Sequence, residues 1–268
     1  MKYITSPSNP TIKGIKGLKR KKERWEKKSY LIEGVKIVDE YIKWIGNPEC
    51  VLISEDLFNV TGGKELFKKI EELNTNTINI PNSLLKELSD TENPQGILAV
   101  GKINDFKLEG LFKSKNKFII ILDELQDPGN VGTIIRTADA FGASGVVLTN
   151  NCVDVYNPKV VRATMGSLFH IPIVFSDNKI VLTNNFKNEG ITVYSTSLEG
   201  KNYIHEVDLT KDIAIIIGNE ANGVSDEMIS ISDFLIKIPM YGKAESLNAA
   251  VATSVVMYEV ARQRVNNP

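Results

Sequence analysis

The stretch that decides the fold is Phe118-Ile119-Ile120-Ile121-Leu122, which is apolar throughout. A second run of the same kind, Ile213-Ala214-Ile215-Ile216-Ile217, occurs later in the chain. Strands that are buried on both faces are apolar at every position. Strands with one solvent-exposed face alternate apolar and polar residues. Both runs therefore predict strands of a parallel sheet that helices cover on both sides.

Weaker patterns extend this sheet on either side of the two runs. Further strands are expected at 146–148, 192–194 and 234–236, and helices at 131–141, 158–166, 178–188, 225–230 and 247–264. Alternating strands and helices of this kind predict an open α/β domain over residues 117–268. In such a domain, ligands bind beyond the carboxyl ends of the strands.

The first part of the chain predicts a second, smaller α/β domain. Helices are expected at 35–45, 64–73 and 84–88, and extended segments at 31–34, 51–53, 78–80 and 96–100. We place this domain at residues 1–105. Residues 106–116 are mostly polar and are expected to form a linker.

Charge is concentrated at the N-terminus although the whole chain has a formal net charge of only −1. Residues 1–30 hold ten lysines and arginines and two glutamates, a local charge of +8. Such a cluster attracts a phosphate backbone, although it is also what a solvated helix face contains. Tyr3, Trp25 and Tyr30 lie within the cluster, where they would either stack on bases or join a core.

Composition excludes several classes of protein. No apolar run reaches the roughly 18 residues that a membrane span needs. The N-terminus lacks the apolar segment of a secretion signal. Cys50 and Cys152 are far apart, and the chain has only two histidines, so no metal site is expected. A cytoplasmic protein is the simplest interpretation.

Three polar motifs follow predicted strands, and the first is Leu125–Ala138, written Leu-Gln-Asp-Pro-Gly-Asn-Val-Gly-Thr-Ile-Ile-Arg-Thr-Ala. Asp127-Pro128-Gly129 predicts a turn, and Asn130 is expected to cap the helix that follows. At about 100° per residue, Arg136 lies opposite the apolar face of that helix. It is therefore expected to face solvent or a ligand.

The second motif, Gly218-Asn219-Glu220-Ala221-Asn222-Gly223, follows the strand 213–217. Its glycines allow a tight turn and a close approach to a ligand. The spacing is that of a phosphate-binding loop, but the lysine that such a loop needs is missing. An acid in the loop repels phosphate and suits a cofactor without phosphate groups.

The third motif runs from Ile238-Pro239-Met240 to Ser246-Leu247-Asn248, which opens the last helix. Ser246 is a reasonable cap for that helix. A fourth stretch, 162–172, contains Arg162 and Ser167, which would touch RNA or else serve only packing.

Together the motifs resemble those of the SpoU family, the RNA ribose 2′-O-methyltransferases that use S-adenosylmethionine. The resemblance covers about residues 117–264. It implies an α/β domain of the SPOUT type, with a parallel sheet and a C-terminal trefoil knot, and an obligate homodimer. The implied catalytic residues are Arg136, Asn130, Glu220, Ser246 and Asn248. The implied cofactor-binding residues are Thr196, Ser197, Gly218, Asn219, Glu220, Gly223, Ile238, Met240 and Leu247.

The N-terminal domain resembles the RNA-binding domain of the family's ribosomal-RNA enzymes, which is similar to small ribosomal proteins. This part of the resemblance rests on Ser6–Pro10, the lysine run and Leu31-Ile32-Glu33-Gly34. Together with the fourth stretch, it implies that the RNA-binding residues are Lys13, Lys16, Lys19, Arg20, Lys21, Lys22, Arg24, Arg162 and Ser167. A 23S ribosomal RNA is the expected substrate. A tRNA methyltransferase and an RNA-binding relative without activity are the alternatives.

Overall fold

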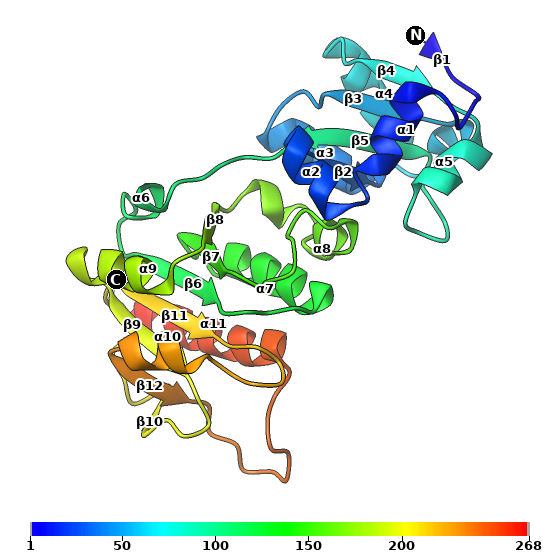
Figure 1. Ribbon diagram of the computed structural model, residues 1–268. Coiled ribbons are helices and arrows are strands. Elements are labelled where there is room, and N and C mark those ends of the chain that lie inside the picture. Colours follow the sequence, from blue (N-terminus) through cyan, green and yellow to red (C-terminus); the bar gives the residue numbers. More distant parts are fainter. Residues whose placement is uncertain (1, 267–268) are drawn as a thin grey trace. The chain divides into compact units, whose positions relative to one another are not determined.

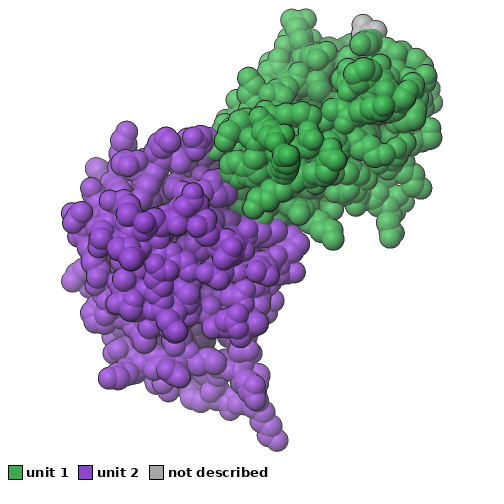
Figure 2. All heavy atoms as spheres, viewed as in Figure 1, with its two compact units in different colours: residues 1–104, 154–169 green, residues 105–153, 170–268 purple. Residues whose placement is uncertain are grey.

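The computed structural model describes residues 2–266 and divides them into two compact units (Figure 2). Unit 1 consists of residues 1–104 and 154–169, and unit 2 of residues 105–153 and 170–268. The segment 154–169 comes from the middle of the C-terminal half of the sequence. The division expected from the sequence placed that segment with the C-terminal domain, whereas its packing places it in unit 1.

Unit 1 is built on a five-stranded mixed sheet of order β1-β4-β3-β5-β2 (Figure 1). The strands are β1 (Lys2–Tyr3), β2 (Ser29–Glu33), β3 (Cys50–Ile53), β4 (Thr77–Asn79) and β5 (Ile97–Lys102). The helices are α1 (Pro10–Gly17), α2 (Lys21–Lys27), α3 (Val35–Trp44), α4 (Gly63–Glu72) and α5 (Asn82–Leu88), with a 3-10 turn, η1, at Glu55–Asn59. Strand β5 runs antiparallel to β2 and β3, and the other pairs are parallel. The small α/β unit predicted from the sequence is confirmed.

The core of unit 1 explains the N-terminal helices, which the sequence had not predicted. Ile12 and Ile15 of α1 and Leu84 of α5 lie in one buried cluster with residues of β2, β3 and β5. On α1 the apolar residues recur every three positions, which buries one face and leaves the lysines between them exposed. The basic run therefore forms the outer side of two short helices.

The segment 154–169 adds helix α8 (Pro158–Ala163) and a 3-10 turn, η2 (Ser167–Phe169), to unit 1. Helix α8 packs against β2. The ring of Phe169 meets that of Tyr41 edge to face, with centroids 5.3 Å apart. The carboxylate of Asp154 forms an ion pair with Arg24 of α2, in which both side chains are almost completely buried.

Unit 2 is built on a seven-stranded sheet in which every pair is parallel (Figure 1). Its order is β10-β12-β9-β11-β6-β7-β8. The strands are β6 (Phe118–Leu122), β7 (Gly145–Thr149), β8 (Ile173–Ser176), β9 (Thr192–Thr196), β10 (Asn202–Tyr203), β11 (Ile213–Ile217) and β12 (Phe234–Lys237). The helices are α6 (Leu108–Leu111), α7 (Pro128–Ala140), α9 (Lys179–Asn188), α10 (Asp226–Ile231) and α11 (Ala249–Asn266).

The two all-apolar runs are the central strands β6 and β11, which are hydrogen-bonded to each other. Residues of these strands pack with α9 and α10 in one buried cluster, while α7 and α11 pack against each other. The prediction of a parallel sheet is confirmed. Strands β8 and β10 were not predicted. The segment expected to be a linker contains α6, whose Leu111 is buried in the core of unit 2.

Candidate active site

Four loops of unit 2 begin at neighbouring strand ends. They follow β12, β9, β11 and β6, which are adjacent in the sheet and parallel. Their carboxyl ends therefore lie along one edge. All three sequence motifs are in these loops, so motifs about a hundred residues apart in the sequence meet in space.

In the first motif, Asn130 does not have the capping role that the sequence predicted. Helix α7 begins at Pro128, and its cap is Asp127, whose Oδ1 accepts a hydrogen bond of 2.7 Å from the main-chain N–H of Asn130. The prediction that Asn130 caps the helix is therefore wrong. Aspartate followed by proline was the pattern that marked this start. With Asp127 as the cap, the amide of Asn130 is free to bond elsewhere.

Asn130 joins the other two motifs through its side chain. Its Nδ2 donates to Oε1 of Glu220 over 3.0 Å, and its Oδ1 accepts from Nδ2 of Asn248 over 2.9 Å. These two partners determine which end of the Asn130 amide is nitrogen and which is oxygen. The nitrogen faces a carboxylate, which accepts, and the oxygen faces a donor. Three side chains that sequence analysis placed in one catalytic neighbourhood are thus in direct contact.

The carboxylate of Glu220 is held in its ionised form. Main-chain N–H groups of Asp127 and Gln126 donate to it over 3.2 and 3.4 Å, in addition to the amide of Asn130. Partial burial raises the pKa of Glu220, but these hydrogen bonds lower it by more, and the net pKa lies below its ordinary value. Glu220 is therefore a fixed negative charge at neutral pH.

The loop that carries Glu220 is closed by its own backbone. Asn219 and Gly223 exchange two main-chain hydrogen bonds of 2.8 and 2.9 Å. A side chain at Gly218 would meet the backbone nitrogen of Val224 at 2.0 Å, so only glycine fits there. The side chain of Asn219 accepts from the N–H groups of Ala221 and Asn222 and donates to the carbonyl of Glu124. The loop is consequently rigid at its base, and it exposes Glu220 at its tip.

The third motif also differs in its cap. Helix α11 begins at Ala249, and Oδ1 of Asn248 accepts from the N–H groups of Ala250 and Val251 over 2.9 and 3.2 Å. The expectation that Ser246 caps this helix is wrong, because Ser246 lies in the exposed loop three residues before it. Asn248 thus has two functions: its oxygen caps the helix and its nitrogen holds Asn130.

Arg136 is exposed on α7, as its helical position predicted. Within residues 2–266 its guanidinium makes no hydrogen bond or ion pair. A guanidinium has five donors and stays protonated, so an exposed one without a partner is available to an anionic ligand.

The predicted cofactor-binding residues lie along the same strand ends. Thr196 Oγ1 donates to the carbonyl of Ile216, and the N–H of Ser197 donates to the carbonyl of Ile236. Ile238 and Met240 are half-buried after β12, and Leu247 is 38% exposed. In Figure 1 the segment between β12 and α11 is a long extended loop.

An open groove of about 460 Å³ lies beside the amides of Asn130 and Asn248. Its other lining residues come from α7 and α11 and are mainly small or apolar: Thr133, Ala250, Val251, Ser254, Val255 and Tyr258. Three of these, Val251, Val255 and Tyr258, expose 51, 36 and 58% of their surface. The groove therefore joins the polar site to an apolar face of unit 2.

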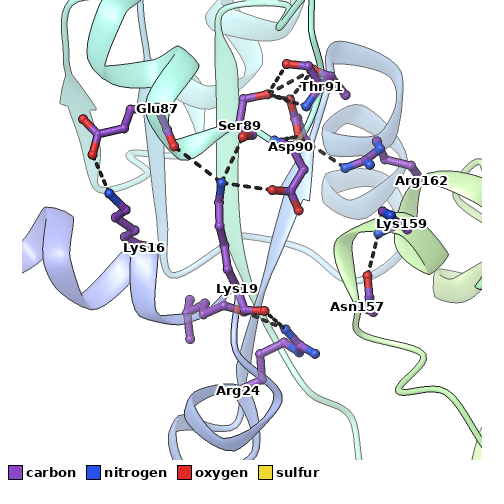
Figure 3. Close-up of polar contacts among 12 residues, drawn as sticks. Lys16, Lys19, Arg24, Glu87, Ser89, Asp90, Thr91, Asn157, Lys159 and Arg162 are labelled. Carbon is purple, nitrogen blue, oxygen red and sulfur yellow. Dashed lines mark hydrogen bonds and ion pairs between the residues drawn. The ribbon is translucent and has the colours of Figure 1, made fainter.

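The predicted RNA-binding cations of unit 1 fall into two groups, and Figure 3 shows Lys16, Lys19, Arg24 and Arg162 among them. Lys16 and Lys19 form ion pairs with Glu87 and Asp90, and Arg20 and Lys22 form pairs within α2 or just before it. Arg20 and Lys22 remain 73 and 84% exposed. Lys13 and Lys21 are exposed and have no ion pair within the described part of the chain. These six side chains are accessible wholly or in part.

Arg24 differs from these accessible cations because its side chain is buried. Its guanidinium is 2% exposed, donates twice to Oδ2 of Asp154 over 2.8 and 2.6 Å, and donates to the carbonyls of Leu18 and Lys19. Ser167 is also buried. We therefore correct both assignments, because these side chains serve packing within unit 1. Arg162 is partly exposed and lies 3.5 Å from the carboxylate of Glu33.

Residues 2–266 contain neither a membrane-spanning helix nor a metal-binding cluster. None of the helices there is long and apolar enough to cross a membrane. No group of three or more histidine, cysteine, aspartate or glutamate side chains in that range is arranged to hold a metal ion.

Comparison with known proteins assigns a family to each half of the chain. The SpoU rRNA methylase family matches residues 117–258, and the MRM3-like substrate binding domain matches residues 9–99. The 23S rRNA (guanosine(2553)-2′-O)-methyltransferase RlmP of Bacillus subtilis is 35% identical over 263 residues, which cover 97% of this chain and 99% of that protein.

Solved structures resemble the whole chain as well. The SpoU methyltransferase AviRb of Streptomyces viridochromogenes, in complex with the cofactor AdoMet, superimposes with a TM-score of 0.89 at 28% identity, covering 97% of this chain and 100% of that one. The AdoMet-bound rRNA methyltransferase of Sinorhizobium meliloti superimposes with a TM-score of 0.85 at 30% identity, covering 97% of both chains.

Proposed function

The chain belongs to the SpoU rRNA methylase family, and on that premise we propose that it is an S-adenosylmethionine-dependent RNA methyltransferase that acts on a ribose 2′-hydroxyl of 23S ribosomal RNA. The observation that carries the proposal is the contact of Asn130 with both Glu220 and Asn248. Residues from three separate motifs would not converge in this way if the motifs were ordinary turns.

The residues at the strand ends suit S-adenosylmethionine. The cofactor carries a positive sulfonium and no phosphate, and the fixed anion Glu220 favours such a ligand and disfavours nucleotides. Leu198 and Leu247 expose 63 and 38% of their surface beside these loops, which gives apolar area for an adenine to cover. We assign cofactor binding to Thr196, Ser197, Gly218, Asn219, Glu220, Gly223, Ile238, Met240 and Leu247.

When bound, S-adenosylmethionine supplies a methyl group activated by the positive charge on sulfur. The protein has to orient the ribose oxygen and accommodate the loss of its proton. Arg136 is the candidate for the first task, because its free guanidinium suits the phosphate beside the ribose. The carboxylate of Glu220 already accepts three hydrogen bonds and has a lowered pKa, so it acts as an orienting charge more readily than as a base.

Asn130, Asn248 and Ser246 complete the proposed catalytic neighbourhood. Asn130 and Asn248 are tied together and to Glu220, so they keep the three loops in one arrangement. Ser246 is on the exposed loop before Asn248, where its hydroxyl is free to contact RNA or cofactor.

RNA binding is assigned to unit 1, in keeping with the domain division proposed from the sequence, 1–105 for the substrate and 117–268 for catalysis. The accessible cations Lys13, Lys16, Lys19, Arg20, Lys21 and Lys22 would contact the phosphate backbone. Arg162, on the segment 154–169, would contribute to the same surface. Arg24 and Ser167 are left out because they are buried.

Two further properties belong to the proposal. One is a trefoil knot at the C-terminus of unit 2. The other is a homodimer that covers the apolar groove between α7 and α11, where Val251 and Tyr258 are more than half exposed. An enzyme that modifies ribosomal RNA works where ribosomes are made, so a cytoplasmic location is part of the proposal.

The test is transfer of labelled methyl from S-adenosylmethionine to total RNA from cells that lack the enzyme, followed by mapping of 2′-O-methyl positions. One labelled position in 23S ribosomal RNA is expected. Label confined to tRNA would refute the assignment to 23S ribosomal RNA but keep the catalytic one. Cofactor binding with no label in naked RNA or in assembling ribosomal particles would show an RNA-binding relative without activity.

A further inference from the structure

A lysine that no motif contains lies beneath the loop that carries Glu220. Lys179 is the first residue of α9, and its Nζ is 2.8 Å from Oδ1 of Asp123. It is also 2.8 Å from Oε1 of Glu124 and 3.0 Å from Oγ of Ser225. A lysine ammonium has three protons, and here each has an acceptor. The side chain is 10% exposed, so almost no water reaches it.

Local helix energetics do not explain a lysine at this position. The N-terminus of a helix carries a partial positive charge, which disfavours a cation in the first turn. The helix already has a cap, since Oδ1 of Asn178 accepts from the N–H of Val181. The reason for Lys179 therefore lies in the two carboxylates that it meets.

Lys179 compensates the buried negative charge of Asp123. Its side chain is 1% exposed, and a carboxylate removed from water is costly unless it is paired and hydrogen-bonded. Lys179 is the only cation that forms an ion pair with it within residues 2–266. Burial raises the pKa of Asp123, but the hydrogen bonds from Lys179 and Ser225 lower it by more, so it remains charged.

Asp123 and Glu124 in turn hold both ends of the loop. At its start, Nδ2 of Asn219 donates to the carbonyl of Glu124 over 2.8 Å. At its end, the N–H of Ser225 donates to Oδ2 of Asp123 over 2.9 Å. Glu124 has a φ of 59°, in the left-handed region that non-glycine residues rarely adopt without support.

We infer that Lys179 is a positioning residue for the cofactor site: it binds Asp123, Glu124 and Ser225 together and thereby fixes the loop 218–225 that presents Glu220. Lys179 does not touch the ligand. It acts through the strand end that the loop is attached to. This inference rests on the proposed function for the identity of the ligand, but not for the effect on the loop.

The main test replaces the ammonium and keeps most of the stem, as Lys179→Met. The dissociation constant for S-adenosylmethionine should rise by roughly tenfold or more, the scale found when a supporting hydrogen bond behind a binding site is removed. The KM for RNA should stay within about twofold, because the RNA surface assigned to unit 1 is untouched. The matched control is Lys187→Met on the same helix, where the lysine is 46% exposed and 4.0 Å from Asp233.

A second variant separates positioning from mere charge compensation. Lys179→Met with Asp123→Asn removes the buried charge together with its partner, so the fold should recover much of its thermal stability. Cofactor affinity should stay low, because the tethers from Nζ to Glu124 and Ser225 are still missing. Recovery of both stability and affinity would show that Lys179 only neutralises Asp123.

Amide hydrogen exchange gives a readout that needs no ligand. In Lys179→Met, and in the double variant with Asp123→Asn, the peptide covering 218–225 should exchange at least about tenfold faster than in the unaltered protein. The centre of β11 should stay protected. Unchanged exchange there, or unchanged cofactor affinity in a folded Lys179→Met protein, overturns the inference. If the unaltered protein fails to bind S-adenosylmethionine, the proposed function fails instead, and the exchange result alone decides on Lys179.

Discussion

The strand-end edge of unit 2 and the basic helices of unit 1 use polar side chains in opposite ways. At the edge, a few side chains form one continuous chain of hydrogen bonds, from Asn248 through Asn130 to Glu220. On the helices, most cations are exposed and paired with nearby acids, as Arg20 and Lys22 are. The first arrangement fixes geometry and the second supplies charge, so single substitutions should be severe at the edge and mild on the helices.

Arg24 is the exception that sharpens this comparison. It lies in the basic run, yet its guanidinium donates four hydrogen bonds, to the carboxylate of Asp154 and to two main-chain carbonyls. Its partner Asp154 comes from the other half of the sequence, so this buried ion pair is one of the contacts that hold segment 154–169 in unit 1. Within the basic run, burial and not charge distinguishes Arg24 from the cations that we propose for RNA binding.

The largest effect is therefore expected from Asp154→Ala. This change leaves the guanidinium of Arg24 buried without its anion and should lower the free energy of unfolding by about 3–5 kcal/mol. Chemical denaturation followed by circular dichroism measures it. The control is Asp105→Ala, whose ion pair with Lys107 is about three-quarters exposed on both sides and should contribute less than about 1 kcal/mol. Similar effects for the two variants would remove the distinction drawn for Arg24.

Arg136→Ala should abolish most methyl transfer and leave cofactor affinity nearly unchanged. The loss of a charged group that acts on the reacting part of the substrate typically costs about 10²–10³ in kcat. Single-turnover transfer and calorimetric titration with S-adenosylmethionine check the two halves separately. Lys159→Ala, an exposed cation on α8, serves as the control. Near-normal transfer by Arg136→Ala would refute its catalytic assignment.

Asn130→Ala breaks the chain of hydrogen bonds at its centre. Removing these two hydrogen bonds leaves Glu220 and Asn248 without their common partner, at a cost of about 1–3 kcal/mol, or roughly 10- to 100-fold in kcat/KM. Asn150→Ala is the matched control, because among the described residues that amide bonds only the carbonyl of Asp177, which follows a neighbouring strand. An Asn130→Ala enzyme that works as well as Asn150→Ala would mean that the three motifs act independently.

The lowered pKa of Glu220 predicts how the stability of the fold depends on pH. A group with a folded pKa below its ordinary value of 4.5 stabilises the fold above that pH, and this stabilisation is lost as pH falls through the lowered value. The unaltered protein should therefore be more stable than Glu220→Gln at pH 7, and the two should converge as the pH falls through the lowered pKa of Glu220. Thermal denaturation at several pH values measures the difference, with the exposed Glu227→Gln on α10 as control. A difference that does not shrink as the pH falls below the ordinary value of 4.5 contradicts the assignment.

The smallest effect is expected on the basic helices. Replacing Lys13 and Lys21 by alanine should weaken RNA binding only a few-fold and reduce the slope of affinity against salt by about 0.7–0.9 for each phosphate that is no longer neutralised. Electrophoretic mobility shifts at several salt concentrations give that slope. Lys68→Ala, a 79% exposed lysine on α4, controls for a general change of charge. An unchanged slope would move the RNA surface away from α1 and α2.

Much of the fold was predictable because local patterns report local burial. The central strands β6 and β11 and the outward direction of Arg136 followed from apolar runs and from helical spacing. Strand β8 was missed because it is short and follows Pro172 in a stretch without periodicity. Helices α1 and α2 were missed because both are short and because lysines equal the aliphatic residues in number in α1 and outnumber the single aromatic residue in α2.

The sequence by itself determined which residues stand at strand ends and which faces of the helices are apolar. Only the tertiary structure decided their partners: Asn130 meets residues 90 and 118 positions away, and Arg24 meets one 130 positions away. It also decided that Asp127 and Asn248 cap the helices, which frees Asn130 to bridge the motifs. The physical reason is that these hydrogen-bonded pairs depend on the order of the strands in the sheet. The residues next to each strand in the sequence do not determine that order.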